Sequence, residues 1–352
     1  MAYTTIDKPT DYFNTVLWTG NGADRTITTD HATDWIWMKD RDQAIYHRLT
    51  DSVRGSAKVL FTNVTDAEQS DQYGTVGSFT STGFTIRQGA TNSNYVGANE
   101  NNIKYVGWSW VAGGSASSNS NGSITSSVSA NTTAGFSIVS YTGTGSNATV
   151  GHGLGVAPKL LILKSRTRSD GQWSVGSDML GWTKFLYLDA TSAEQTFNIY
   201  QDTAPTSSVF YLSSDGGVNQ SSGNMIGYAF AEKKGYSKFG KYTGNGNADG
   251  SYIHLGFRPA WLLVKKSSAS GSDWNLHHNK SPGFNVNDNY LAPNENAAEV
   301  TNNSYQIFDL LSNGFKCRGT GTGTNGSGAT YIYMAFAESP FVTSTGIPTT
   351  AR

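Results

Sequence analysis

The stretch Phe136-Ser-Ile-Val-Ser-Tyr-Thr-Gly-Thr-Gly145, continued by Ala157-Pro-Lys-Leu-Leu-Ile-Leu-Lys164, decides the fold of this 352-residue chain because it occurs again further on. It returns as Phe239-Gly-Lys-Tyr-Thr-Gly-Asn-Gly246, followed by Arg258-Pro-Ala-Trp-Leu-Leu-Val-Lys265. A turn sequence followed by a short apolar run and a lysine is therefore the opening of a repeated unit.

A third, fainter copy of this opening lies near the start of the chain, as Leu17-Trp-Thr-Gly-Asn-Gly22 and Trp35-Ile-Trp-Met-Lys39. Each copy also closes on small and aromatic residues, at Tyr105–Trp110, Met225–Glu232 and Tyr331–Glu338. The last two closing segments end 106 positions apart. That spacing is typical of a small β-sandwich domain and far exceeds the period of a solenoid repeat.

Short alternating or apolar runs bounded by turn residues indicate strands, for example at 136–141, 160–163 and 184–188. No window of a dozen residues combines helical periodicity with caps. The sequence therefore predicts an all-β fold of three tandem antiparallel β-sandwich domains, of the jelly-roll or lectin-like type.

The expected domain organisation follows from the repeats. It comprises an N-terminal arm at 1–12, repeat 1 at 13–112, a Gly/Ser/Asn-rich linker at 113–134, repeat 2 at 135–234, repeat 3 at 235–342 and a C-terminal tail at 343–352. We expect the linker to be ordered by packing against another domain or subunit. Because the connection at 233–238 is short, repeats 2 and 3 should form a nearly rigid pair, with repeat 1 oriented differently.

The apolar run of each opening should form the same inner strand in each repeat. Alternate residues of that strand would then face the core. Lys39, Lys164 and Lys265, which end the three runs, are expected to reach solvent.

Composition narrows the possible functions. Charged residues make up 14% of the chain and the net charge is −1, while Gly, Ser, Thr and Asn are abundant. We therefore expect neither nucleic acid nor a membrane as a partner. We expect no signal region at the start of the chain and no membrane-spanning segment, because no run of 18 apolar residues occurs in the sequence.

The histidines do not form a motif typical of catalysis or metal binding. His277 and His278 are adjacent, and no His pair at i,i+4 spacing comes with a Glu. The sequence therefore predicts no catalytic residue, no metal site, no cofactor and no enzymatic activity.

Aromatic residues that follow turns are the best candidates for binding. The candidate binding residues are Trp173, Trp182, Trp274, His277, His278, Asn287 and Tyr290. Indole rings at loop edges near Asp and Asn commonly stack on sugars or anchor a protein interface. The alternative is that Trp173 and Trp274 are one repeated core residue, because they recur in register.

The repeated motifs carry a resemblance to a known group of proteins. The combination Tyr-Thr-Gly-x-Gly, a proline before the apolar run and Lys, Ser-Asp/Asn-Gly, and Tyr/Met-Ala-Phe-Ala-Glu resembles a domain of uncharacterised structural proteins of marine tailed phages. The first copy, from Val16 to Gly55, is similar to a pattern in tail fibre proteins. The resemblance implies a virion protein assembled in the cytoplasm of a host bacterium.

Two functions are compatible with that resemblance. One is a tail fibre or receptor-binding protein that contacts a surface glycan or protein of the host, through loops around 274–279, 285–290 and 319–328. The other is a capsid or tail decoration protein that packs on other virion proteins. A polysaccharide depolymerase is a remote alternative, because no acidic pair can be nominated. We expect a homo-oligomer, a trimer by analogy with phage fibres, with residues 1–12 and 113–134 at its contacts.

Overall fold

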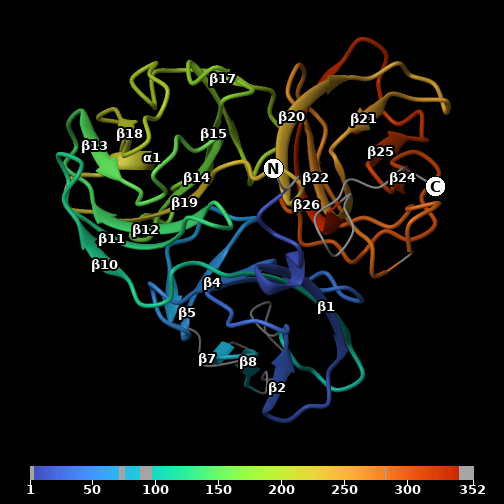
Figure 1. Ribbon diagram of the computed structural model, residues 1–352, viewed down its shortest axis with the longest axis horizontal. Coiled ribbons are helices and arrows are strands. Elements are labelled where there is room, and N and C mark those ends of the chain that lie inside the picture. The colour runs from blue at the N-terminus through green and yellow to red at the C-terminus, as the bar shows by residue number, and fades with distance from the viewer. Residues whose placement is uncertain (1–3, 71–75, 88–96, 282, 341–352) are drawn as a thin grey trace.

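The computed structural model describes residues 4–70, 76–87, 97–281 and 283–340. The chain forms three lobes around a common axis, and each lobe is built from one repeat (Figure 1). The predicted all-β fold is confirmed, because the regular elements of the described residues are antiparallel strands apart from one 3-10 helix and one four-residue α-helix. The C-terminal tail predicted at 343–352 lies outside the described residues.

The first repeat follows a short 3-10 helix, η1 (Pro9–Asp11). Its strands are β1 (Phe13–Thr19), β2 (Arg25–Thr28), β3 (Trp35–Asp40), β4 (Arg48–Asp51), β5 (Lys58–Phe61), β6 (Gln69–Ser70), β7 (Val76–Thr80), β8 (Gly83–Ile86) and β9 (Lys104–Trp110). They form a larger sheet in the order β1-β9-β3-β4-β5-β6 and a smaller one in the order β2-β8-β7.

The second repeat has the same plan, with two additional strands at one edge of its larger sheet. Its elements are β10 (Ser117–Asn119), β11 (Ser126–Asn131), β12 (Phe136–Thr142), β13 (Ala148–Gly151), β14 (Leu160–Ser165), β15 (Ser174–Ser177), β16 (Lys184–Tyr187), β17 (Gln195–Thr196), β18 (Val209–Leu212), α1 (Gly216–Asn219) and β19 (Asn224–Phe230). The larger sheet has the order β10-β11-β12-β19-β14-β15-β16-β17, and β13 pairs with β18.

The third repeat closes the chain. Its strands are β20 (Ser237–Thr243), β21 (Tyr252–His254), β22 (Phe257–Lys266), β23 (Trp274–His278), β24 (Phe308–Leu311), β25 (Gly314–Cys317) and β26 (Thr330–Pro340). The larger sheet runs β20-β26-β22-β23 and the smaller one β21-β25-β24.

Strand pairing places the repeated motifs in equivalent positions. In each repeat the closing strand lies between the opening strand and the strand of the apolar run: β9 between β1 and β3, β19 between β12 and β14, and β26 between β20 and β22. Trp35, Leu160 and Trp261 face Trp110, Phe230 and Phe336, respectively. The register predicted from the openings and closings is thus confirmed.

The closing strands are buried on both faces, which explains why their sequences are almost continuously apolar. In β26, Ile332, Met334 and Phe336 belong to a core shared by all three repeats, whereas Tyr331 and Tyr333 belong to a core within the third repeat. Consecutive residues of a strand point to opposite faces, so one strand lines both cores.

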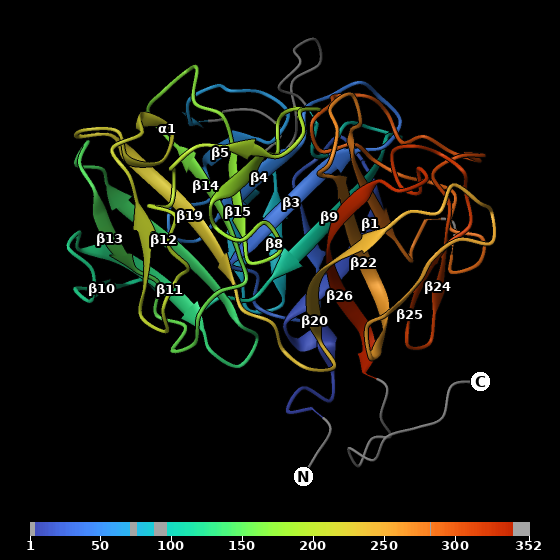
Figure 2. The same ribbon diagram turned by 90° about the horizontal axis from the view of Figure 1, so that it is seen from above.

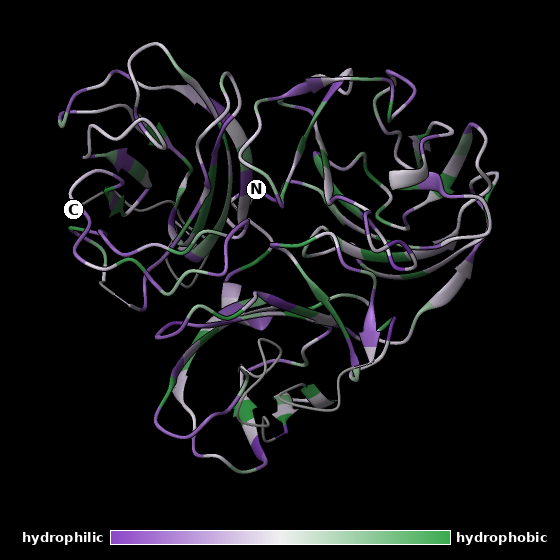
Figure 3. Cartoon of the chain, turned by 180° about the vertical axis from the view of Figure 1, so that it is seen from behind, coloured by the Kyte–Doolittle hydropathy of each residue, from purple (hydrophilic) through white to green (hydrophobic). Residues whose placement is uncertain are grey.

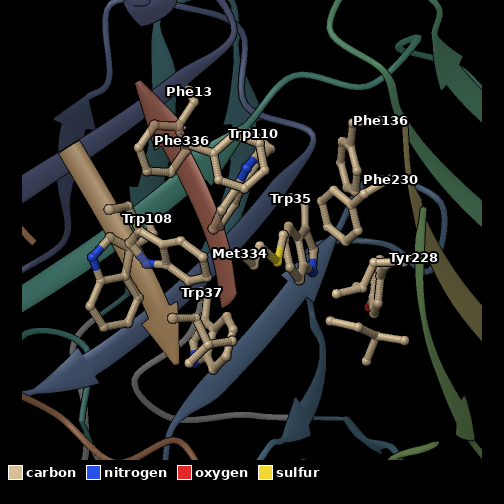
Figure 4. Close-up of a cluster of buried hydrophobic side chains, with 14 of the residues drawn as sticks. Phe13, Trp35, Trp37, Trp108, Trp110, Phe136, Tyr228, Phe230, Met334 and Phe336 are labelled. Carbon is tan, nitrogen blue, oxygen red and sulfur yellow. The ribbon is translucent and has the colours of Figure 1, made fainter. Parts of the chain in front are cut away.

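The shared core lies where the three lobes meet (Figure 4). Trp110 and Phe336 have ring centroids 5.4 Å apart, and Phe230 and Phe336 are 6.1 Å apart. Trp35 stacks on Tyr228 of the second repeat at 4.7 Å. The larger sheets therefore pack on one another with aromatic side chains, while each smaller sheet covers the outer face of its own larger sheet (Figure 3).

The segment expected as a linker is part of the second repeat. β10 pairs with β11, and β11 pairs with β12. Ile124 and Val128 are buried in the core of that repeat. The serines and glycines of 113–134 are thus ordered because their backbone extends the sheet of the second repeat.

The two ends of the described chain lie on one face of the molecule (Figure 2). η1 contacts β26, and Phe13 stacks on Phe336 at 5.2 Å. Helix α1 lies at the opposite face (Figure 2).

Candidate functional site

The residues predicted to bind a ligand are mostly inside the protein. Trp173, Trp182, Trp274, His277, His278 and Asn287 are buried, and Tyr290 is partly exposed. Trp182 packs on Tyr200 in the core of the second repeat. Buried rings cannot present a stacking surface, so the expected aromatic binding face is not formed by these six side chains.

Trp173 and Trp274 are core residues that join neighbouring repeats, which confirms the alternative interpretation. The indole Nε1 of Trp173 donates a hydrogen bond of 2.8 Å to the carbonyl of Phe61 in the first repeat. Nε1 of Trp274 donates one of 2.9 Å to the carbonyl of Tyr187 in the second repeat. Each indole therefore satisfies a carbonyl at the end of a strand in the preceding repeat.

His47 occupies the equivalent position in the first repeat, next to Arg48, which pairs with Met38. Its Nδ1 accepts a hydrogen bond of 3.1 Å from the indole of Trp37, so the ring proton resides on Nε2. Burial lowers the pKa of His47 well below its usual value, while the carbonyl of Ala292 in the third repeat acts in the opposite direction. The Thr62 hydroxyl donates a hydrogen bond of 2.8 Å to the carbonyl of Pro293 in the third repeat, so the contacts between repeats close into a ring.

The lysines that end the apolar runs are also at the junctions. The expectation that they reach solvent is wrong, because Lys39, Lys164 and Lys265 are at most 1% exposed. The Nζ of Lys164 donates a hydrogen bond of 2.7 Å to the carbonyl of Thr65 in the first repeat. Nζ of Lys265 lies 3.4 Å from the carbonyl of Thr191 in the second repeat. Lys164 and Lys265 thus bind backbone carbonyls of the preceding repeat, whereas Lys39 binds the carbonyls of Asp40 and Gln43 in its own repeat.

Burial lowers the pKa of all three lysines to about 8. Between pH 8 and 10 the unfolded chain keeps these protons while the folded chain has released them, so the free energy of unfolding should rise with pH. Between pH 8 and 10, each lysine should raise the free energy of unfolding by roughly 1 kcal/mol per pH unit. Above pH 10 the trend should reverse, because burial raises the pKa of Tyr228 and Tyr236.

Urea unfolding at several pH values measures how the free energy of unfolding depends on pH. Lys164→Met should reduce the slope of that dependence between pH 8 and 10 by about the contribution of one lysine. An identical slope in the variant would contradict the assignment.

Three glutamates hold equivalent places in the junction loops. Their backbone N–H groups donate to carbonyls of the next repeat, Glu68 to Arg166, Glu194 to Ser267 and Glu299 to Arg41, each at 2.9 Å. The three junctions therefore share the same backbone hydrogen bond.

Two of the junctions add an ion pair to that backbone contact. Glu68 accepts two hydrogen bonds from Arg166, of 2.9 and 2.8 Å. Glu299 accepts one of 2.7 Å from Arg41. Burial opposes ionisation of Glu299, but His278 and Arg41 hold its pKa down to about 2. The Glu299 carboxylate therefore remains charged at neutral pH.

The junction between the second and third repeats differs, because Ser267 stands where the others have arginine. Glu194 instead pairs with Lys184 of its own repeat. A cavity of about 310 Å³ opens at this junction. Its lining consists of Met179, Leu180, Lys184, Glu194, Lys241, Ser267, Ser268, Thr330 and Ile332. This cavity between two repeats is the candidate binding site, and sequence analysis missed it because its residues come from distant strands.

Burial shifts the pKa values of two titratable side chains in the interior of the third repeat. Burial lowers the pKa of His277 to about 4, and its Nδ1 is 2.9 Å from Oδ1 of Asn287. Burial raises the pKa of the Cys317 thiol to about 12, so no thiolate forms at neutral pH. Within the described ranges, no group of three or more His, Cys, Asp or Glu side chains could hold a metal ion.

No helix in the described part of the chain has the length and apolar character needed to cross a membrane. Comparison with curated proteins gave no match. Residues 8–340 match one family, and this match spans nearly the whole sequence. The chain therefore belongs to the family described as a domain of unknown function, DUF7483.

Proposed function

We propose that this chain is a non-catalytic structural protein of a bacteriophage virion, a tail fibre or receptor-binding protein that contacts a polymer on the host surface. The observation that carries the proposal is the division of the molecule into two faces. Both ends of the described chain leave from one face, and loops of a rigid scaffold lie at the other (Figure 2). A protein attached at one end and binding at the other is built in this way.

The composition and the fold support the same proposal. The chain has few charges and is rich in Gly, Ser, Thr and Asn, so its surface suits contact with a hydroxyl-rich polymer. Within this proposal each repeat is a two-sheet β-sandwich of the lectin-like type, and the motif resemblance supplies the assignment to phage particles. We retain the homotrimer as part of the proposal, and its mass in solution by light scattering tests it.

The proposed attachment can be tested with the purified protein. Fluorescently labelled protein should bind cells of the host bacterium and be displaced by polysaccharide extracted from those cells. Heat-unfolded protein at the same concentration is the control for nonspecific adhesion. Failure of the native protein to bind host cells would contradict the receptor-binding proposal.

A decoration protein is the second candidate, because the three repeats form a closed ring with approximate threefold symmetry. Such a shape would fit a threefold position of a capsid lattice without a homotrimer. A density map of the virion distinguishes the two candidates. Density at the tail tip supports attachment, whereas density on the capsid lattice supports decoration.

A further inference from the structure

The cavity between the second and third repeats exists because one junction lacks the arginine that occupies the equivalent space in the others. In the first junction, Arg166 lies between Glu68 and Ser140, and its Nη1 is 3.4 Å from the Ser140 hydroxyl. The guanidinium group therefore fills the space between the junction loop and the opening strand β12.

The residues at the positions of Arg166 and Ser140 are different in the third repeat. Strand pairing aligns Lys241 with Ser140, since Lys241 faces Ile332 and Ser140 faces Ile226. Ser267 replaces the arginine, and its backbone still accepts the hydrogen bond from Glu194. The backbone frame is retained while a large side chain is missing, which leaves an open space lined by polar groups.

The lining suits a ligand that is both anionic and rich in hydroxyl groups. Lys184 and Lys241 supply two ammonium groups against the single carboxylate of Glu194. Lys184 is paired with Glu194, whereas Lys241 is exposed and has no ion pair among the residues that the structure describes. Lys241 is therefore the group available for a ligand carboxylate.

The rest of the cavity lining combines hydrogen-bonding groups with apolar walls. Ser268 and Thr330 offer hydroxyl groups at the rim, while Leu180 and Ile332 form buried apolar walls. A sugar ring has the same division, with hydroxyl edges and C–H faces. A volume of about 310 Å³ is at the lower end of the range for ligand sites and admits a single ring.

We propose that this cavity binds one residue of an acidic saccharide, with the sugar carboxylate on Lys241 and the hydroxyl groups on Glu194, Ser268 and Thr330. This inference rests on the proposed function and names the chemical class of the host polymer as a glycan that contains uronic acid. Inorganic anions lack the C–H face that would use the apolar wall.

The repeats themselves provide the variant that tests this site. Ser267→Arg restores the residue found at the equivalent positions Arg41 and Arg166, so the backbone can accept it. The new guanidinium should pair with Glu194 and fill the cavity. Ser118→Arg adds the same charge on the exposed edge strand β10 and is the matched control. Lys241→Gln removes the carboxylate partner without filling the space and gives a second test if Ser267→Arg folds poorly.

Titration calorimetry and NMR with digalacturonate, and with maltose as a neutral disaccharide, measure the binding. We expect the native protein and Ser118→Arg to bind digalacturonate in preference to maltose. Ser267→Arg and Lys241→Gln should weaken this binding at least about tenfold, which corresponds to 1.4 kcal/mol. Absence of digalacturonate binding, equal binding of maltose, or unchanged binding in both variants would overturn the proposal.

Failure of the proposed saccharide site and failure of the proposed attachment function would give different experimental results. Native protein that binds host cells but not digalacturonate would overturn the saccharide site and leave the attachment function standing. Native protein that binds digalacturonate through Lys241 but not host cells would support the site and contradict attachment.

Discussion

Replacing Trp35 with alanine is expected to lower the free energy of unfolding by about 3–5 kcal/mol. Trp35 is 1% exposed, and its ring centroid lies 4.4 Å from that of Trp110 and 4.7 Å from that of Tyr228. Its removal leaves a cavity between the first and second repeats that the surrounding aromatic rings can fill only in part. Chemical denaturation followed by circular dichroism measures the loss.

Tyr305→Ala is the matched control for Trp35→Ala, because it also truncates an aromatic side chain, one that is 61% exposed. Its effect should stay within about 0.5 kcal/mol. Since the three repeats share the core around Trp35, we also expect the native protein and the Trp35→Ala variant each to unfold in one transition. A Trp35→Ala protein in which only the first repeat melts early would show that the repeats are energetically independent.

Removing Glu68 should also destabilise the protein, because Arg166 would lose its ion-pair partner and the buried Arg54 would keep only Asp51. Its carboxylate binds Arg166 and lies 3.1 Å from Nη1 of Arg54, whose side chain is 0% exposed. Glu68→Ala is expected to cost about 3 kcal/mol of stability, the lower end of the range for broken buried ion pairs, because Asp51 still pairs with Arg54. Thermal and urea unfolding at neutral pH measure the difference.

The repeat architecture offers an internal control for Glu68→Ala. Glu194 has the same place in the next junction, but its partner Lys184 is 40% exposed. Glu194→Ala should therefore cost no more than about 1 kcal/mol. Equal losses for the two variants would show that backbone contacts, and not ion pairs, account for the strength of the junctions.

The sequence was sufficient to predict the strands and their register, because turn residues and period-two alternation depend on local structure. The run from Leu160 to Leu163 and its equivalents formed the predicted strands. The sequence also contained the signal that the closing strands are buried on both faces. What covers each face is not encoded locally, so the core shared by the repeats could not be predicted.

The lysines and indoles show why the site was missed. A lysine after an apolar run usually marks the solvent end of a strand, but Lys164 meets the carbonyl of Thr65, which lies about a hundred residues earlier. Trp173 and Trp274 follow turns, as surface aromatics often do, yet each points into the neighbouring repeat. Only the assembled ring brings Glu194, Lys241 and Ser267 to one cavity, although alignment of the repeats already shows serine where the other copies have arginine.

The closed ring has a consequence for synthesis on the ribosome. Phe13 stacks on Phe336, and Thr62 donates a hydrogen bond of 2.8 Å to the carbonyl of Pro293, so the first repeat is completed only by the last. At elongation rates of roughly 5–20 residues per second, the tryptophan-rich face of the first repeat remains uncovered for on the order of ten seconds or more. A nascent chain that stalls before β26 exposes that face to chaperones, proteases and other nascent chains. Messages truncated in the third repeat should accordingly yield aggregates, even though two complete repeats have been made.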